Sequence, residues 1–312
     1  MSEHFLLFDV GGTDIKAALA DEHGHFLHVL REPTIVAVAE LAAATLMRQL
    51  VELAARLRKL SGQTPLAAGL VVCGLVDAEH GIGIFSANLG WRRAPLRQMA
   101  EQALGLPVGF GHDVTLAARA ELEFGSGAAD PDLKRSTVVM IIGTGISSAL
   151  LVDGRIVSSG GYAGELGHAQ VPGGLDCKCG NTGCLETLGS AGAIASRYEQ
   201  RTGRRGGAKE VFEARKAGDS AAAQVIADAI EALSFTLAQQ CASIAPEGIV
   251  IGGGLAQAGD RFFEELQVAL YARLSFHRKP RLVPAQLGAN AGLRGSLILA
   301  QEASEKNQGK TP

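Results

Sequence analysis

Two similar segments, about 130 residues apart, constrain the fold of this chain more than any other feature. Phe8-Asp9-Val10-Gly11-Gly12-Thr13 and Ile141-Ile142-Gly143-Thr144-Gly145 each place a Gly/Thr turn between two short apolar runs. Apolar runs of this length, bounded by turn residues, are typical of buried strands. The repetition predicts two domains of the same build, each containing a strand–turn–strand unit.

These turns have the chemistry of a phosphate site. Glycine lets the backbone approach a ligand closely, and successive N–H groups form an anion-binding concavity. Thr13 and Thr144 add hydroxyl donors, Lys16 can reach phosphate oxygens, and Asp9 can hold a water molecule of Mg²⁺. The turns match neither the P-loop nor the Rossmann pattern, and the alternative is that they are only tight hairpins. A third glycine cluster at 252–254, between a strand and a helix, favours nucleoside binding.

A group of cysteines predicts a metal site. Cys177, Cys179 and Cys184 follow His168 in a glycine-rich stretch without periodicity. Three Cys and one His match a tetrahedral zinc site, and four protein ligands would close it, so that the metal would be structural. The alternative is a set of unpaired core thiols with a surface histidine. Cys73 and Cys241 stand in apolar strand and helix patterns, which indicates ordinary core positions.

The remaining pattern predicts an α/β protein with mixed sheets, because runs with strand character alternate with amphipathic helices. The residues after Asp153-Gly154 should form a hairpin with those before it. We expect the tail 306–312 to be disordered. The predicted strands are 5–10, 15–20, 26–30, 66–73, 108–111, 137–142, 147–152, 156–158, 248–251 and 282–284, and the predicted helices are 37–60, 114–124, 260–274 and 291–305.

Charge and composition exclude several classes of protein. The net charge of -3 argues against binding to nucleic acid or to a membrane surface, which would need a basic face. Five cysteines in 312 residues argue against a disulfide-stapled secreted domain. The segment Met1–His4 has no basic signal-peptide region, and no uncharged apolar run reaches the ~18 residues of a membrane span. We therefore expect a cytoplasmic protein.

Polar residues near these motifs suggest a sugar site. Asp113 follows a strand and begins a helix, where its ordinary role would be an N-cap. Asn88 lies in a turn beside Trp91, the single tryptophan. Three further polar residues flank or belong to the metal stretch: Glu165, His168 and Glu186. Each alone is an ordinary surface residue, but together they offer the directional donors and acceptors that a polyhydroxylated ligand needs.

The chain resembles the ROK family (repressors, open reading frames, kinases) from about residue 5 to 300. The resemblance rests on Asp9-x-Gly11-Gly12-Thr13-x-x-Lys16, Gly143-Thr144-Gly145, Gly164-Glu165-Leu166-Gly167-His168 and Cys177-x-Cys179-Gly180-x-x-Gly183-Cys184-Leu185-Glu186. It implies a two-domain actin-like (ribonuclease H-like) ATPase fold with a cleft between the domains. We expect residues 1–112 plus 291–312 to form the small N-terminal domain, and 113–290 to form the large domain that carries the zinc loop.

The resemblance also implies roles for individual residues. Asp113 is the expected catalytic base toward the sugar hydroxyl, and His112 stands where the family commonly has Asn. The implied sugar contacts are Asn88, His112, Asp113, Glu165, His168 and Glu186. The implied ATP and Mg²⁺ contacts are Asp9, Gly11, Gly12, Thr13, Lys16, Gly143, Thr144, Gly145, Gly253 and Gly254. The implied ligands of a structural Zn²⁺ are His168, Cys177, Cys179 and Cys184.

The predicted function is therefore an ATP-dependent hexose kinase, with glucose as the leading substrate. Kinases of N-acetylmannosamine, N-acetylglucosamine, fructose or allose are alternatives within the family. A sugar-responsive repressor is disfavoured, because the first strand begins within about five residues of Met1 and leaves no room for a helix-turn-helix domain. A non-catalytic sugar-binding protein is disfavoured because Asp113, Lys16 and both Gly/Thr turns are retained. The resemblance implies a homodimer.

Overall fold

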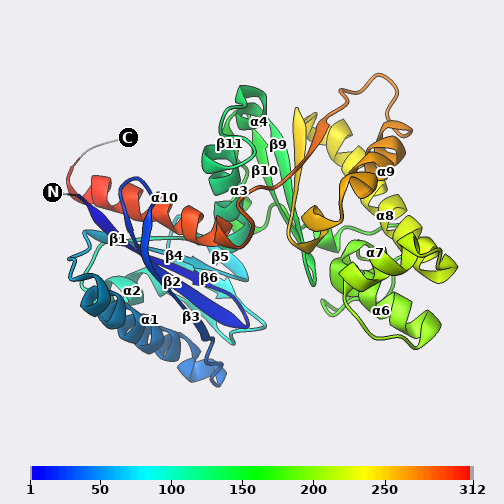
Figure 1. The fold of residues 1–312 in the computed structure, drawn as a ribbon. Helices are drawn as coiled ribbons and strands as arrows, with labels where there is room; N and C mark the ends of the chain where they lie inside the picture. The colour runs from blue at the N-terminus through cyan, green and yellow to red at the C-terminus, as the bar shows by residue number, and fades with distance from the viewer. Residues whose placement is uncertain (1, 310–312) are drawn as a thin grey trace. The chain divides into compact units, whose positions relative to one another are not determined.

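A computed structural model describes residues 2–309 (Figure 1). They form two compact units. The first contains the chain up to Phe124, the segment Ser158–Tyr162 and the chain from Ala289 onward, and the second contains Gly125–Val157 and Ala163–Gly288. Residues 113–124, predicted to lie in the large domain, belong to the first compact unit. The helix that they form packs against the C-terminal helix of that unit.

The sheet of the first unit mixes antiparallel and parallel strands. Its order is β3-β2-β1-β4-β8, with β1 antiparallel to β2 and parallel to β4, and β4 parallel to β8. Because parallel strands point the same way, the carboxyl ends of β1, β4 and β8 meet at one edge. The strands are β1 (His4–Val10), β2 (Asp14–Asp21), β3 (Phe26–Pro33), β4 (Ala67–Val72) and β8 (Val108–His112).

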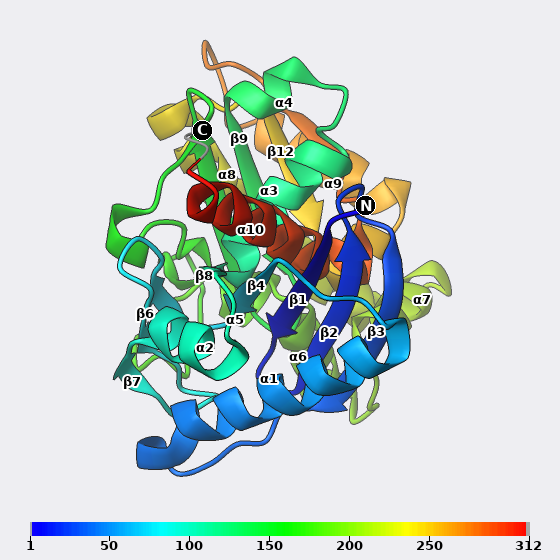
Figure 2. The ribbon, with the colours of Figure 1, turned by 90° about the vertical axis from the view of Figure 1, so that its left-hand side faces the viewer.

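Helices cover both faces of this sheet. Side chains alternate along a strand, so Leu6 and Phe8 of β1 pack toward one face and Phe5 and Leu7 toward the other. The first face is covered by α1 (Ala39–Ser61) and α2 (Leu96–Leu104), and the second by α10 (Ala291–Asn307) with α3 (Asp113–Phe124). Figure 2 shows α1 and α10 on opposite sides of β1 and β2. Burial on both faces explains the continuous apolar runs of β1 and β4.

A small second sheet of this unit was not predicted. It consists of β5 (Leu75–Asp77), β6 (Ile82–Phe85) and β7 (Arg92–Ala94) in antiparallel order. The turn between β6 and β7 carries Asn88 and ends at the buried Trp91. These strands are three or four residues long, too short for a readable alternation.

The second unit repeats the sheet of the first. Its order is β11-β10-β9-β12-β13, again with two antiparallel pairings followed by two parallel ones. The repeated order confirms the prediction of two domains of the same build. Asp153 and Gly154 both have left-handed backbones and close the expected hairpin. The strands are β9 (Thr137–Ile142), β10 (Ile146–Val152), β11 (Arg155–Ile156), β12 (Gly248–Gly252) and β13 (Arg281–Pro284).

The helices of the second unit share one apolar cluster with its sheet. Met140 and Ile142 of β9 pack there with residues of α8 and α9 (Figure 1). By length and composition alone α8 could cross a membrane, but 56% of its apolar window is buried inside the structure. A core helix passes the same test. The helices are α4 (Pro131–Arg135), α5 (Glu186–Gly189), α6 (Ala191–Thr202), α7 (Ala208–Lys216), α8 (Ser220–Ile244) and α9 (Asp260–Tyr271).

Two details of the sequence analysis were wrong. The spacing of Leu46, Leu50, Leu53, Leu57 and Leu60 predicts one buried face for the helix 37–60, and the first four are buried, but Leu60 in the last turn is 55% exposed. Lys306, predicted to begin a disordered tail, belongs to α10, which continues to Asn307. The rest of that prediction falls partly on residues 310–312, which lie outside the described residues.

Candidate sugar and nucleotide site

The β1–β2 turn is held by hydrogen bonds on both sides. The Gly11 N–H donates to the Asp14 carbonyl over 2.9 Å, which closes the turn. The Thr34 hydroxyl donates to the Gly11 carbonyl (2.8 Å), and the Thr34 N–H donates to the Thr13 carbonyl (2.9 Å). A Cβ at Gly12 would lie 3.0 Å from the Cβ of Asn88, so glycine lets the Asn88 turn approach. The structure thus places Asn88 beside the predicted phosphate turn.

Asp9 and Lys16 face each other at the base of this turn. Lys16 Nζ lies 3.2 Å from Asp9 Oδ2 and also donates to the Ala289 carbonyl over 3.2 Å. Burial raises the pKa of Asp9, and the ammonium group of Lys16 opposes that rise. A Cβ at Gly292, in the first turn of α10, would lie 2.3 Å from Asp9 Oδ2. The start of α10 therefore fixes the position of this carboxylate, a relation that no local sequence signal indicated.

Asp113 stands at the same edge of the sheet, directly after β8. The Val114 N–H donates to Asp113 Oδ1 over 2.8 Å, and His112 Nε2 lies 3.1 Å from that oxygen. Burial raises the pKa of Asp113, and the electrostatic effect of His112 opposes the rise. Cys73 follows β4 between them, and burial together with the charge of Asp113 raises its pKa to about 12. The first unit therefore gathers two carboxyl groups and an un-ionised thiol at the carboxyl ends of its parallel strands.

The β9–β10 turn is the counterpart in the second unit. The Gly143 N–H donates to the Gly145 carbonyl (3.0 Å), and the Ala191 N–H at the start of α6 donates to the Gly143 carbonyl (2.9 Å). Gly253 has a left-handed backbone, and a Cβ there would lie 2.4 Å from the Ile142 carbonyl oxygen. The structure therefore brings together the predicted phosphate turn and the predicted nucleoside turn of this unit.

A cavity of about 310 Å³ adjoins this nucleoside turn. Gly254 and Leu255 line one side, and Ala208 and Phe212 of α7 line another. A flat apolar group fits between backbone and an aromatic side chain of this kind. Lys209, Glu213 and Lys216 also line it, and Lys216 forms an ion pair with Glu213 (2.9 Å). The cavity is the candidate site for the adenosine group.

The predicted metal ligands converge within the second unit. One ligand atom from each of His168, Cys177, Cys179 and Cys184 lies within 4.8 Å of every other. Cys179 Sγ is 3.6 Å from Cys184 Sγ, and Cys177 Sγ is 3.8 Å from His168 Nδ1. Metal–ligand bonds of ~2.0–2.3 Å in a tetrahedron separate ligand atoms by roughly 3.5–3.8 Å. The four residues therefore fit a zinc ion.

Burial and hydrogen bonds shift the pKa values of the three thiols in different directions. Without a cation, burial raises the pKa of the Cys177 thiol to about 12 and also raises that of Cys184. A hydrogen bond from the Asn181 backbone lowers the pKa of Cys179. A zinc ion bound here would stabilise the thiolate form of its ligands against this effect of burial. Gly180, with a left-handed backbone, lies between the second and third thiols, and its N–H donates to the Cys177 carbonyl over 3.0 Å.

Glu186 links this cluster to the phosphate turn. Cys177 Sγ donates to Glu186 Oε1 over 3.1 Å, and the Ile146 N–H donates to Glu186 Oε2 over 3.4 Å. Glu186 is the first residue of α5, directly after the cluster. Glu165 is exposed and precedes the short helical turn Leu166–His168. The structure thus places His168 and Glu186 together and leaves the Glu165 side chain at the surface.

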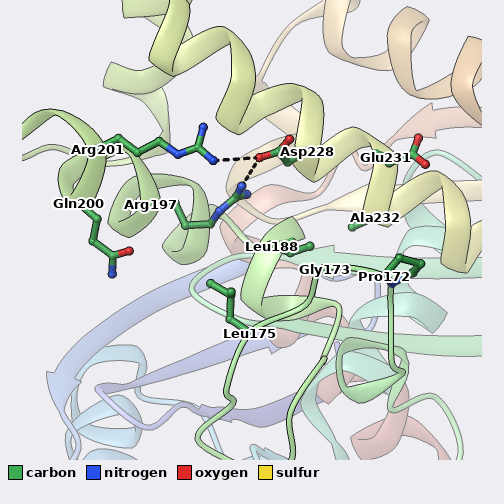
Figure 3. Close-up of a pocket in the computed structure, with 10 residues that line it drawn as sticks. All are labelled: Pro172, Gly173, Leu175, Leu188, Arg197, Gln200, Arg201, Asp228, Glu231 and Ala232. Carbon is green, nitrogen blue, oxygen red and sulfur yellow. Dashed lines mark hydrogen bonds and ion pairs between the residues drawn. The ribbon is translucent and has the colours of Figure 1, made fainter.

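A further cavity of about 460 Å³ lies beside the loop that leads to the cluster (Figure 3). Pro172, Gly173 and Leu175 line its loop side. On its helical side Arg197 and Arg201 of α6 both point to Asp228 of α8, which forms ion pairs with each of them. These pairs tie α6 to α8.

The sheets define the class of protein to which this chain belongs. Two α/β units with the same strand order, each with a glycine turn between its first two strands, constitute the actin-like ATPase fold. The model of the ROK family matches residues 6–303, and the chain therefore belongs to the ROK family. It is 31% identical to a glucokinase of Halalkalibacterium halodurans, over 97% of each chain.

Solved structures of two kinds resemble this one. A ROK family glucokinase from Streptomyces griseus, in complex with glucose and AMPPNP, shares 26% identity at a TM-score of 0.76 and matches 97% of this chain and all of its own. A ROK family transcriptional regulator, a homologue of the Escherichia coli MLC protein, shares 25% identity at a TM-score of 0.86. This chain covers 78% of the regulator.

Proposed function

We propose that this protein is an ATP-dependent hexose kinase that transfers the γ-phosphate of ATP to a sugar hydroxyl, with glucose as the leading acceptor. The observation that carries the proposal is the placement of Asp113. Its carboxylate stands at the carboxyl edge of the sheet whose β1–β2 turn presents backbone N–H groups and Lys16. A base and a phosphate-binding turn on one rigid sheet are the two elements that phosphoryl transfer to a hydroxyl requires.

Asp113 acts as the base in this proposal. Phosphoryl transfer passes through a loose transition state, so that positioning and charge neutralisation dominate catalysis. An ordinary aspartate is a weak base, with a pKa near ~3.9. Burial raises the pKa of Asp113, which makes its carboxylate a stronger base than that of an ordinary aspartate. It accepts the proton of the acceptor hydroxyl as the new P–O bond forms.

The glycine turns and their partners bind ATP. The Gly11 and Gly143 N–H groups close their own turns, and the backbone N–H groups of Gly12 and Thr13 in the first unit and of Thr144 and Gly145 in the second meet phosphate oxygens. Lys16 neutralises phosphate charge, and Asp9 holds a water of the Mg²⁺ that accompanies the nucleotide. Gly253 and Gly254 carry the adenosine group at the cavity beside α7.

The polar residues near the cluster bind the sugar. Asn88 in the first unit and Glu165, His168 and Glu186 in the second offer amide, carboxylate and imidazole groups to its hydroxyls. His168, Cys177, Cys179 and Cys184 would hold a structural zinc ion; with His168 Nδ1 on the Cys177 side as the ligand atom, the metal would orient the imidazole ring toward the sugar. Removal of the metal would therefore disturb sugar binding as well as stability.

ATP as a substrate and five free thiols favour the cytoplasm as the location of the protein. We also propose a homodimer, which rests on the family resemblance alone.

An ADP-release assay over a panel of hexoses and N-acetylhexosamines tests the proposed function. We expect glucose to give the highest kcat/KM, with release that depends on both the sugar and Mg²⁺. Preference for N-acetylglucosamine or N-acetylmannosamine would keep the reaction and change the acceptor. Sugar binding measured by calorimetry, without ADP release for any acceptor, would contradict the kinase and favour a sugar-responsive regulator.

A further inference from the structure

His112 is enclosed by protein partners on both sides of its ring. It is the last residue of β8, next to Asp113. Its Nε2 lies 3.1 Å from Asp113 Oδ1, and its Nδ1 lies 3.3 Å from the hydroxyl oxygen of Thr115, one turn into α3. The side chain of His112 is only 20% exposed. Each ring nitrogen therefore already has a partner within the first unit.

This arrangement decides what the imidazole can offer to a ligand. A neutral imidazole has one N–H donor and one acceptor nitrogen, and a charged imidazolium has two donors. A carboxylate accepts only, so Nε2, which lies at ion-pair distance from Asp113 Oδ1, is assigned a hydrogen in either state. Nδ1 accepts from the Thr115 hydroxyl in the neutral ring and donates to the Thr115 oxygen in the charged one. Both polar atoms of the ring are used, and a sugar hydroxyl would have to displace Thr115 or Asp113 to bind to it.

We propose that His112 is a positioning residue that acts on the sugar only through Asp113. This inference rests on the proposed function. It replaces the direct sugar contact that the family resemblance implied for His112. Asp113 Oδ1 is held from two sides, by His112 and by the Val114 N–H. The carboxylate cannot rotate without losing both partners, and Oδ2 is left to accept the proton of the substrate.

His112 has a second effect on Asp113, which is a change in the pKa of its carboxyl group. Burial and the carboxylate of Asp9, at the end of β1, raise the pKa of Asp113. The Cys73 thiol at the end of β4 faces the same carboxylate and stays un-ionised, because its own pKa is raised to about 12. Among the neighbouring side chains, His112 supplies the effect that lowers the pKa of Asp113. Replacement of His112 by an uncharged residue should therefore raise the pKa of the base.

Steady-state kinetics of His112→Ala, His112→Asn and Thr115→Val separate the two roles. If His112 acts through Asp113, His112→Ala lowers kcat by roughly tenfold and leaves the sugar KM within about twofold. A side chain that orients the base without touching the sugar affects turnover and not sugar binding. The acid limb of kcat/KM moves to higher pH. His112→Asn recovers part of kcat, because an amide N–H can face the carboxylate. Thr115→Val gives a smaller loss of kcat in the same direction.

A titration of the Asp113 carboxyl group, which does not depend on catalysis, completes the test. The Asp113 carboxyl group is followed by carbon-13 NMR in the wild type and in His112→Ala, and glucose affinity is measured on both by calorimetry. We expect a higher pKa of Asp113 in the variant and an unchanged glucose Kd. A tenfold weaker glucose Kd together with an unchanged Asp113 titration would overturn the proposal. A wild type without kinase activity would refute the proposed function, and this titration would still decide the role of His112.

Discussion

The thiol of Cys177 donates a hydrogen bond to the carboxylate of Glu186, with Cys177 Sγ 3.1 Å from Glu186 Oε1. The other carboxylate oxygen accepts from the N–H of Ile146, the residue that follows the 143–145 turn. One side chain therefore joins the metal cluster to the backbone of a proposed phosphate turn. Loss of metal from the cluster should therefore alter this turn and the proposed sugar contacts beside it.

Removal of the metal is the first test of this coupling. We expect the purified protein to hold about one zinc ion per chain, as a closed site with four protein ligands does. Chelation should lower both the thermal midpoint and the affinity for glucose, because the metal would no longer hold the four clustered residues together, His168 among them. Metal analysis, thermal unfolding and calorimetry on the same sample measure all three.

Cys241 provides the control for the metal experiment. It is 2% exposed within the core of the second unit and is not one of the four clustered residues. Cys241→Ala should retain the full zinc content, whereas Cys177→Ser should lose most of it. Metal-free protein with unchanged stability and unchanged glucose affinity would show that the cluster has no such role.

Two glycines of the same turn form a matched pair of variants. A Cβ at Gly145 would lie 2.8 Å from Glu186 Oε2, whereas a Cβ at Gly143 would meet nothing within 4 Å. Because a carboxylate is the far end of a flexible side chain, we expect Gly145→Ala to displace Glu186 and not the turn. Glucose affinity measured without ATP should fall by about tenfold, or ~1.4 kcal/mol. Gly143→Ala should leave it unchanged, and equal losses in both variants would argue against a role for Glu186.

Substitution of the proposed base should separate binding from turnover. Asp113→Asn should lower kcat by at least ~10²-fold while glucose still binds, because the amide cannot accept the proton. Burial disfavours the ionised carboxylate, so the variant should be at least as stable as the wild type near neutral pH. Kinetics, calorimetry and thermal unfolding supply the three readouts, and a near-normal kcat would remove Asp113 from the mechanism.

The pH dependence of kcat/KM follows from the same carboxyl group. Asp113 must be ionised to act as a base, so activity is full above its folded-state pKa and is lost as the pH falls through that value. Because burial raises that pKa, the loss should begin at a higher pH than an ordinary aspartate, at ~3.9, would give. A profile that stays flat down to pH 4 while the protein remains folded would contradict this reading.

The sequence was most informative for sites whose residues lie close together in the chain. Glycine is seldom replaced in tight turns that approach a ligand, which made the turns after Val10 and Ile142 recognisable. Cysteine is a common zinc ligand, which made the Cys177–Cys184 stretch recognisable. The structure confirms the two repeated sheets and the convergence of the four ligands. The short strands β5–β7 carried no such signal.

Long-range packing was the part that the sequence could not supply. Gly292 packs against Asp9, and Glu186 against Gly145, across long intervals of chain. Such contacts depend on how helices lie on a sheet, which no local periodicity encodes. The position of the His112 ring between Asp113 and Thr115 is another example, since the family resemblance implied only a sugar contact for this residue.

Phosphorus-31 NMR of the reaction with ATP, Mg²⁺ and glucose tests the central claim most directly. We expect a sugar phosphate monoester to form in a 1:1 ratio with ADP in the wild type, and neither product to accumulate in Asp113→Asn over the same time. Release of ADP with only inorganic phosphate, or no ADP while glucose binds, would contradict the account of this chain as a hexose kinase.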